Sequence, residues 1–284
     1  MRLEQPQAIR TIFFDAGQTL LQPYPSVVEI CQQVCQRAGL SVDLSRLKQG
    51  LIEAEDYFYR QVRLNRHTWA SEQAINELWL GYYVSMLRQA VDERSDQRLY
   101  ELARAITDEF AAHTSWEVFP DVVPTLEVLQ QHHYTLGVIS DWGISLGPIL
   151  RRHRLTRFFD CVIVSAIARY AKPSTLLYET ALRRANAIAD YTLHVGDSYI
   201  HDVLGARSAG MTPVLLDRAH RLRSSDVDCI LIHSLTELLE LLELPGPSQI
   251  SGAQEIRPTP PAFPPAQHER DGSQQQPSTP FLQG

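Results

Sequence analysis

The sequence has few cysteines and no long apolar run, which argues against a disulfide-stabilised protein and against a membrane-spanning one. Its 284 residues contain only Cys31, Cys35, Cys161 and Cys229, too sparse for a disulfide framework, so we expect buried free thiols. No stretch approaches the roughly 18 apolar residues of a membrane span. The polar segment 1–10 lacks the apolar core of a signal peptide. We therefore expect a cytoplasmic protein without a membrane partner.

Lysine is almost absent. Of the 26 basic Lys and Arg residues, only Lys48 and Lys172 are lysines, and the formal net charge is -7. No basic patch interleaved with aromatic residues is present, so a nucleic-acid partner is not expected. In a chain that otherwise uses arginine, a lysine is a candidate for a role that needs a compact ammonium group.

A short buried strand is predicted at 11–14, where an apolar run contains β-branched and aromatic residues. The segment that follows, 26–113, is predicted to be helical because its apolar residues repeat at helical spacing. From Trp116 onwards strands and helices alternate, which is typical of βαβ units in a parallel sheet with helices on both faces. Helices are expected at 121–131, with Asp121 as N-cap, and at further positions. The other predicted helices are 144–153, 174–187, a stretch ending near 209, and 235–244. The predicted strands of this region are 135–140, 159–165, 192–195, 212–216 and 229–232.

The predicted organisation is an α/β protein of three parts. Residues 1–22 and 114–245 form the sheet domain, and 23–113 form a helical insert after the first strand. Residues 246–284 are rich in Pro, Gln and Ser with almost no periodic apolar residues, so we expect a disordered tail.

Polar side chains follow three predicted strands, at the sheet edge where α/β proteins bind ligands. Asp15 follows the first strand, Ser140 and Asp141 end the second, and Lys172 follows the third. A carboxylate at such an edge can act as a nucleophile on phosphorus. Ser140, Asp141 and Lys172 are then expected to bind the phosphate, with Lys172 neutralising charge.

A fourth strand end adds Asp197 and Asp202. With Asp15 these make three converging carboxylates, which would repel one another without a metal. Mg²⁺ removes this repulsion because it prefers hard oxygen ligands, so Asp15, Asp197 and Asp202 are the predicted metal ligands. Each feature also has a simpler interpretation: Gly196-Asp197 as a turn, Ser140 as a helix cap, Lys172 as a solvated side chain. The order of the features on successive strand ends favours the functional interpretation.

These residues resemble the haloacid dehalogenase-like (HAD) superfamily over about residues 10–244. Four stretches carry the resemblance: Phe13–Leu20, Val138–Asp141, Ala171–Pro173 and Val195–Met211. The resemblance implies a Rossmann-like core, Mg²⁺, an aspartyl intermediate and, most often, phosphatase activity on small phosphorylated metabolites. The helical insert is similar to the cap of subfamily I members.

Gly17 departs from the phosphatases of this family, which have a second aspartate at that position. In them its carboxylate protonates the leaving group and activates water, while its main-chain carbonyl binds the metal. Gly17 keeps the carbonyl, so the resemblance still implies a metal site. General acid–base catalysis contributes about 10²–10⁴-fold, so we expect a weaker enzyme that favours good leaving groups.

Three alternatives stay open. The family's dehalogenases also lack the second aspartate, although the pattern of Asp197 and Asp202 is the metal-binding form. Its phosphonate hydrolases need a cap lysine, for which Lys48 is the candidate. A non-catalytic module that binds phosphate or a metabolite would tolerate Gly17 as well.

Overall fold

The computed structural model describes residues 3–64, 67–93 and 95–247. Contacts divide the chain into residues 1–250 and 251–284. The predicted tail, 246–284, therefore lies outside the described residues apart from its first two positions. Within the described ranges, no helix is both long and apolar enough to cross a membrane.

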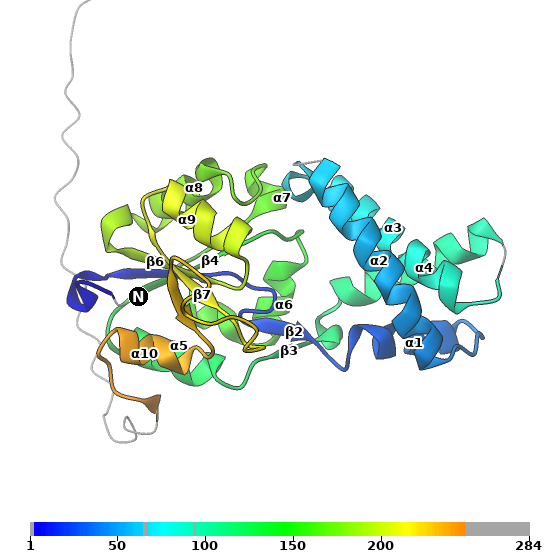
Figure 1. The fold of residues 1–284 in the computed structure, drawn as a ribbon, viewed down its shortest axis with the longest axis horizontal. Coiled ribbons are helices and arrows are strands. Elements are labelled where there is room, and N and C mark those ends of the chain that lie inside the picture. The colour runs from blue at the N-terminus through cyan, green and yellow to red at the C-terminus, as the bar shows by residue number, and fades with distance from the viewer. Residues whose placement is uncertain (1–2, 65–66, 94, 248–284) are drawn as a thin grey trace, which may run out of the picture. The chain divides into compact units, whose positions relative to one another are not determined.

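Six parallel strands form the central sheet, as the alternating pattern predicted (Figure 1). Their order is β5-β4-β1-β6-β7-β8, so the first strand lies in the middle of the sheet between β4 and β6. The strands are β1 (Thr11–Phe14), β4 (Thr135–Ser140), β5 (Cys161–Val164), β6 (Thr192–Gly196), β7 (Thr212–Leu216) and β8 (Ile230–Ile232).

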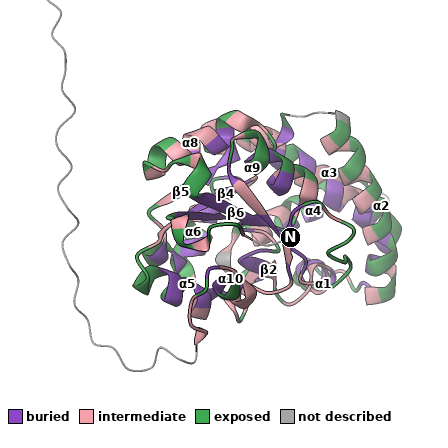
Figure 2. Ribbon diagram, turned by 60° about the vertical axis from the view of Figure 1, so that its left-hand side comes forward, coloured by how far each residue is buried: buried purple, intermediate pink, exposed green. Residues whose placement is uncertain are grey.

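Both faces of the sheet are covered by helices because successive strand residues point to opposite sides. Ile12 and Phe14 pack in a core with α5 (Val122–Gln131), α6 (Leu146–Arg152) and α10 (Thr236–Leu241). Phe13 points the other way, into a core with α8 (Thr175–Ala185) and α9 (Leu204–Ser208). Figure 1 shows α8 and α9 on one side of the strands and α5 and α10 on the other. Figure 2 shows strands that are buried and helices whose outer faces are exposed.

Among the described residues, four helices occupy the segment where the helical insert was predicted, between β1 and α5. They share one apolar cluster, and three of them begin at a serine N-cap. At α1 the Ser26 hydroxyl accepts from the Glu29 amide while the Glu29 carboxylate accepts from the Ser26 amide, a capping box. The four helices are α1 (Val27–Arg37), α2 (Leu44–Leu64), α3 (Glu72–Ala90) and α4 (Asp96–Ala111).

A two-stranded antiparallel sheet joins the two ends of this insert. Strand β2 (Leu21–Pro23) pairs with β3 (Trp116–Val118) in the register Leu21 to Val118. These strands are only three residues long, and the sequence analysis did not predict them, since so short a segment has no clear period. The pairing brings the chain leaving β1 next to the chain that re-enters the sheet domain.

Two local predictions were wrong. Asp121 precedes α5 as expected but does not cap it. Its carboxylate instead accepts two hydrogen bonds from the Arg218 guanidinium, at 2.9 and 3.0 Å, and one from the Leu235 amide at 2.7 Å. Cys161 is only half-buried, whereas the other three thiols are buried as predicted.

Candidate active site

The carboxyl ends of the three central strands meet at one edge of the sheet. Phe14 pairs with Val138 of β4 on one side and with Val195 of β6 on the other. The Asp15 amide continues the ladder by donating to the Val195 carbonyl at 2.8 Å. The register puts Asp15 opposite Ile139, one residue before Ser140 at the end of β4, and both Asp15 and Ser140 are buried. The parallel strands therefore bring these two residues to the same edge of the sheet.

Lys172 lies between two carboxylates. Its Nζ is 2.7 Å from Asp15 Oδ1 and 2.6 Å from Asp202 Oδ1, and its side chain is only 2% exposed. The Ser140 hydroxyl donates to the same Asp15 oxygen at 3.1 Å. The structure thus brings together four predicted site residues that are up to 187 positions apart in the sequence, from Asp15 to Asp202.

Burial and charge act against each other on these groups. Burial raises the pKa of Asp15 to about 6, although the Lys172 charge opposes the rise. Burial would lower the pKa of Lys172, but the carboxylates of Asp15 and Asp202 raise it well above the ordinary value. The lysine therefore stays charged, and its ammonium is the main counter-ion for the buried acids.

Asp202 is held on several sides. Its Oδ1 also contacts His194 Nε2 at 2.8 Å, and its Oδ2 accepts from the Ser198 amide at 3.0 Å. Burial works against the charged form, but Lys172 and His194 together lower the pKa of Asp202 below its ordinary value. A Cβ on Gly196 would lie 2.2 Å from Asp202 Cγ, so this position needs glycine. Asp202 is an ionised carboxylate whose two oxygens both have partners.

Asp197 has a different environment, because the residue is exposed to solvent at the end of β6. Close packing on its inner side, followed by the charges of Asp15 and Asp202, raises its pKa to about 7. The crowding of Asp15 and Asp197 is the repulsion that the sequence predicted. A cation between them would relieve it.

Asp141, predicted to bind phosphate, is engaged with protein groups. Its Oδ1 accepts from the Lys172 amide at 3.0 Å, and its Oδ2 lies 3.4 Å from His201 Nδ1. The hydrogen bond to Asp141 is the main reason that the pKa of His201 is raised. These contacts tie the loop after β4 to the segment that carries Lys172.

Gly17 leaves room beside Asp15. A Cβ at this position would meet the Trp142 ring at 3.4 Å, an ordinary van der Waals distance. Two hydrogen bonds fix Trp142. Its backbone N–H donates to the Ser165 hydroxyl and its indole Nε1–H donates to the Ser145 hydroxyl, each at 3.1 Å. The ring also packs against Trp116, with 4.7 Å between centroids. An aromatic side chain therefore borders the position where related phosphatases carry an aspartate.

The helical insert contacts the loop after β4 through Glu72. Glu72, at the start of α3, accepts a hydrogen bond from the Ile144 amide at 2.8 Å. A Cβ on the neighbouring Gly143 would lie 2.7 Å from the Glu72 carboxylate. The loop after β4, which carries Ser140, Asp141 and Trp142, is thereby in direct contact with the insert.

The donors at this edge fit Mg²⁺. In the described part of the chain, no three His, Cys, Asp or Glu side chains are arranged to hold a metal ion among themselves. Mg²⁺, however, is usually bound by one or two carboxylates, with water and substrate phosphate completing its octahedron. The carboxylates of Asp15 and Asp197, whose charges interact, are donors of this kind.

The sequence analysis missed His194, His201 and Tyr178. His194 lies within an otherwise apolar strand that is fully buried in the structure. A polar residue inside an apolar run was its only signal in the sequence. His201 lies between two site aspartates in the sequence, a signal that could have been used. Tyr178 packs edge-on against His194 with 5.1 Å between ring centroids, a contact that no local pattern encodes.

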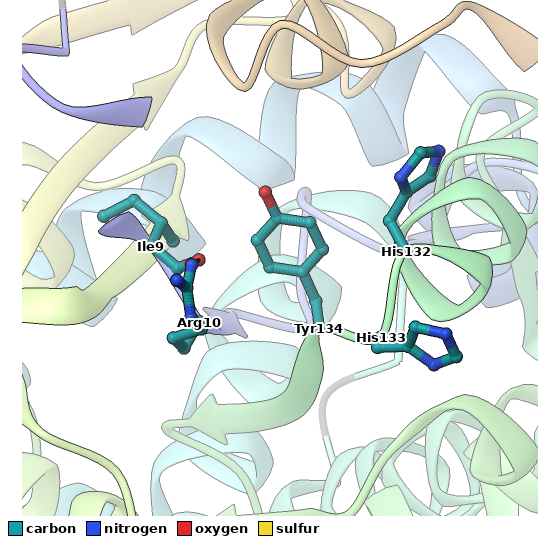
Figure 3. A pocket seen from close by; sticks show the side chains of 5 residues that line it. All are labelled: Ile9, Arg10, His132, His133 and Tyr134. Carbon is teal, nitrogen blue, oxygen red and sulfur yellow. Dashed lines mark hydrogen bonds between the residues drawn. The ribbon is translucent and has the colours of Figure 1, made fainter. Parts of the chain in front are cut away.

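A pocket elsewhere on the protein does not belong to this site. It is lined by Ile9, Arg10, His132, His133 and Tyr134 (Figure 3). Arg10 precedes β1 and Tyr134 precedes β4, so the pocket lies at the amino ends of the strands. The carboxyl ends, with Asp15 and Ser140, are at the opposite edge.

Comparison with known proteins identifies the family. A model of the haloacid dehalogenase-like hydrolases matches residues 9–210. The chain is 30% identical over 210 residues to haloacid dehalogenase-like hydrolase domain-containing protein 3 of Danio rerio, covering 74% of this chain and 86% of the relative. It is 29% identical over 213 residues to a phosphoglycolate phosphatase of Aliivibrio fischeri, covering 71% and 81%.

A solved structure shows the same fold. YfnB from Bacillus subtilis, in a crystal form bound to magnesium, superposes with a TM-score of 0.67 at 18% identity, covering 83% of this chain and 99% of that one. The family model matches most of the chain and includes Asp15, Ser140, Lys172 and Asp202. With its parallel sheet and the acidic cluster at its carboxyl edge, this chain belongs to the haloacid dehalogenase-like hydrolase family.

Proposed function

We propose that the protein is a Mg²⁺-dependent phosphatase of small phosphorylated metabolites, with Asp15 as the nucleophile. The observation that carries this proposal is the double hydrogen bonding of Asp15 Oδ1, by Lys172 at 2.7 Å and by Ser140 at 3.1 Å. These bonds orient the carboxylate and leave Oδ2, to which no described residue donates a hydrogen bond, for attack. The similarity to a phosphoglycolate phosphatase supports the substrate class.

The reaction begins with attack of Asp15 Oδ2 on phosphorus. The bond from phosphorus to the leaving oxygen breaks, and the leaving oxygen takes a proton from water. Water then attacks the phosphorus of the aspartyl phosphate and breaks its bond to the Asp15 oxygen, which releases inorganic phosphate and restores the Asp15 carboxylate. The proton that this water loses neutralises the hydroxide left by the first step. Lys172 and Ser140, which both bond to Asp15, would stabilise negative charge on the phosphoryl oxygens as the group is transferred.

Asp15, Asp197 and the Gly17 carbonyl would hold the cation. When bound, Mg²⁺ supplies positive charge that offsets the crowded acids and the phosphate. The solved structure of YfnB bound to magnesium supports this cofactor. Asp202 contributes its charge while both its oxygens keep Lys172 and the loop after β6 in place.

We further propose that residues 23–113 act as a cap that selects the substrate. The contact between Glu72 and the Ile144 amide supports this proposal, since it joins the insert to the loop that carries Ser140. Trp142, which borders Gly17, offers an apolar surface next to the nucleophile.

Hydrolysis of p-nitrophenyl phosphate and acetyl phosphate tests the function. We expect turnover that requires Mg²⁺, stops with a chelator and falls to background in Asp15→Asn. Asp160→Asn is the matched control, since this carboxylate accepts from the Leu136 amide near the other end of the sheet. Turnover by Asp15→Asn equal to the wild type would refute the nucleophile.

Gly17→Asp tests the missing acid. The new Cβ would sit against Trp142 at an ordinary distance, and Gly17 does not have a positive φ. We expect hydrolysis of alkyl phosphates to rise by about 10²-fold, the lower end of general acid–base catalysis, with a smaller gain for acetyl phosphate. An equal gain for both substrates would show that leaving-group protonation is not what Gly17 lacks.

A dehalogenase is the second candidate function. Two observations favour it: Gly17 supplies no acid, and Asp202 is bound to protein groups through both oxygens. Release of halide from a 2-haloacid in the presence of a chelator would support it over the phosphatase. Lys48 is exposed on α2, which disfavours the phosphonate hydrolase, because a Schiff-base lysine needs a desolvated position.

A further inference from the structure

His194 is a histidine inside the central sheet. It lies on β6, pairs with Phe13 of β1 and with Pro213 of β7, and is 0% exposed. The edge of Tyr178 packs against its ring at 87°. A histidine at such a position loses its hydration, so the contact that it makes is expected to have a specific role.

The ring makes one hydrogen bond among the described residues. Nε2 is 2.8 Å from Asp202 Oδ1, while the buried Nδ1 has no partner in the described part of the chain. Because a carboxylate only accepts, Nε2 must carry the hydrogen and donate it. A second hydrogen on Nδ1 would be buried without an acceptor, so the neutral Nε2–H tautomer is the form that fits this site.

The oxygen that His194 contacts is also the oxygen that binds Lys172. Asp202 Oδ1 is 2.6 Å from Lys172 Nζ, which in turn is 2.7 Å from Asp15 Oδ1. A continuous chain of hydrogen bonds thus runs from the middle of the sheet to the nucleophile. Asp202 Oδ2 is held separately by the Ser198 amide, so only Oδ1 depends on His194.

We propose that His194 is a positioning residue: it fixes Asp202 Oδ1 so that the Lys172 ammonium stays on Asp15. This inference rests on the proposed nucleophilic role of Asp15. Without the Nε2–H donor, Oδ1 would have Lys172 as its only partner, and the lysine would follow Asp202 rather than Asp15. The expected consequence is a slower chemical step with substrate binding little changed.

Three substitutions of His194 separate donation from packing. His194→Gln places an amide donor near the position of Nε2, His194→Asn places it near Nδ1, and His194→Phe fills the space without a donor. Thr192→Val is the control on the same strand, because Thr192 is equally buried and, among the described residues, its hydroxyl bonds to the Ile188 carbonyl alone, away from the site.

The scarcity of lysine provides a readout that does not need turnover. Lys172 and the exposed Lys48 are the only two lysines. Reductive methylation is carried out on the folded protein, and mass spectrometry of its peptides then measures how far each lysine has reacted. The extent of reaction reports the accessibility of Lys172, with Lys48 as the internal reference. Kinetic constants with acetyl phosphate and Mg²⁺ are measured on the same samples.

We expect kcat to fall by about tenfold or more in His194→Phe and His194→Asn, the size of one hydrogen bond to a charged group, with KM changed by less than about twofold. Methylation of Lys172 relative to Lys48 should rise by about threefold or more in both variants. His194→Gln should stay near the wild type in both measurements. Thr192→Val should lower the melting temperature but leave kcat and Lys172 protection unchanged.

Equal behaviour of the Gln and Asn variants would overturn the proposal, and this comparison stands even if His194→Phe does not fold. The proposal would also be overturned if Lys172 in His194→Asn were as well protected from methylation as it is in the wild type. If the wild type hydrolyses no phosphate ester, the proposed function fails, but the methylation ratio alone still decides whether His194 holds Lys172.

Discussion

Replacement of Lys172 by methionine tests the electrostatic account of the site. Methionine fills the space of the lysine stem but removes the ammonium that lies 2.7 Å from Asp15 and 2.6 Å from Asp202. All three side chains are buried, with exposed fractions of 2%, 11% and 3%. The variant leaves two buried carboxylates without their shared counter-ion.

The loss of stability follows from this burial. Removing one partner of a buried ion pair costs about 3–5 kcal/mol, whereas an exposed pair contributes only about 0–1 kcal/mol. For a domain of this size, 1 kcal/mol corresponds to about 2–4 °C in melting temperature, so Lys172→Met should melt roughly 6–20 °C lower. Substitution of the exposed Lys48 by methionine is the matched control and should change little.

The loss should depend on pH. Lys172 and His194 lower the pKa of folded Asp202 below the unfolded value, so this stabilisation is present above the unfolded pKa and is lost as pH falls through the folded one. Without Lys172, the pKa values of Asp202 and Asp15 must rise. The folded variant then binds more protons than the folded wild type, and the difference in stability shrinks as pH falls.

Urea unfolding at pH 7.5 and at pH 5.0 measures this difference in the free energy of unfolding. A chelator in the buffer keeps metal ions from binding to the carboxylates. Lys172→Met should be less stable than the wild type by about 3–5 kcal/mol at pH 7.5 and by clearly less at pH 5.0. The double variant with Asp202→Asn should recover part of the loss, since one unpaired charge is removed. A loss below about 1 kcal/mol at pH 7.5, or an equal loss at both pH values, would refute the account.

Two further substitutions test close packing around the site. Gly196→Ala places a Cβ 2.2 Å from Asp202 Cγ, so the carboxylate must move and Mg²⁺-dependent turnover should fall by about 10²-fold or more; unchanged kinetics would contradict the close approach of Asp202 to the Gly196 backbone. Arg218→Lys keeps the charge but loses the paired hydrogen bonds to Asp121 and the bond to the Thr19 carbonyl at 2.8 Å. It should cost about 1–3 kcal/mol in urea unfolding, and a neutral result would mean that lysine can replace this contact.

The sequence by itself indicated a parallel sheet with helices on both faces and the polar residues at its carboxyl edge. Local patterns were sufficient for the strands at Thr11–Phe14 and Thr135–Ser140, which the structure confirms with the same bounds. Helices were less exact: the one predicted at 174–187 runs from Thr175 to Ala185. Side chains at the carboxyl ends of parallel strands share one edge whatever the packing, so the grouping of Asp15 with Ser140 followed from order alone.

Only the tertiary structure decided which partners these groups have. Asp121 was expected to cap a helix, but it binds Arg218, which lies 97 positions later in the sequence. His194 had no sequence signal beyond its buried position, yet it contacts the same Asp202 oxygen as Lys172. Hydrogen bonds between side chains depend on ångström-scale placement of segments far apart in the chain. Such placement is set by packing of the whole core, whereas periodicity and strand ends are properties of a few neighbouring residues.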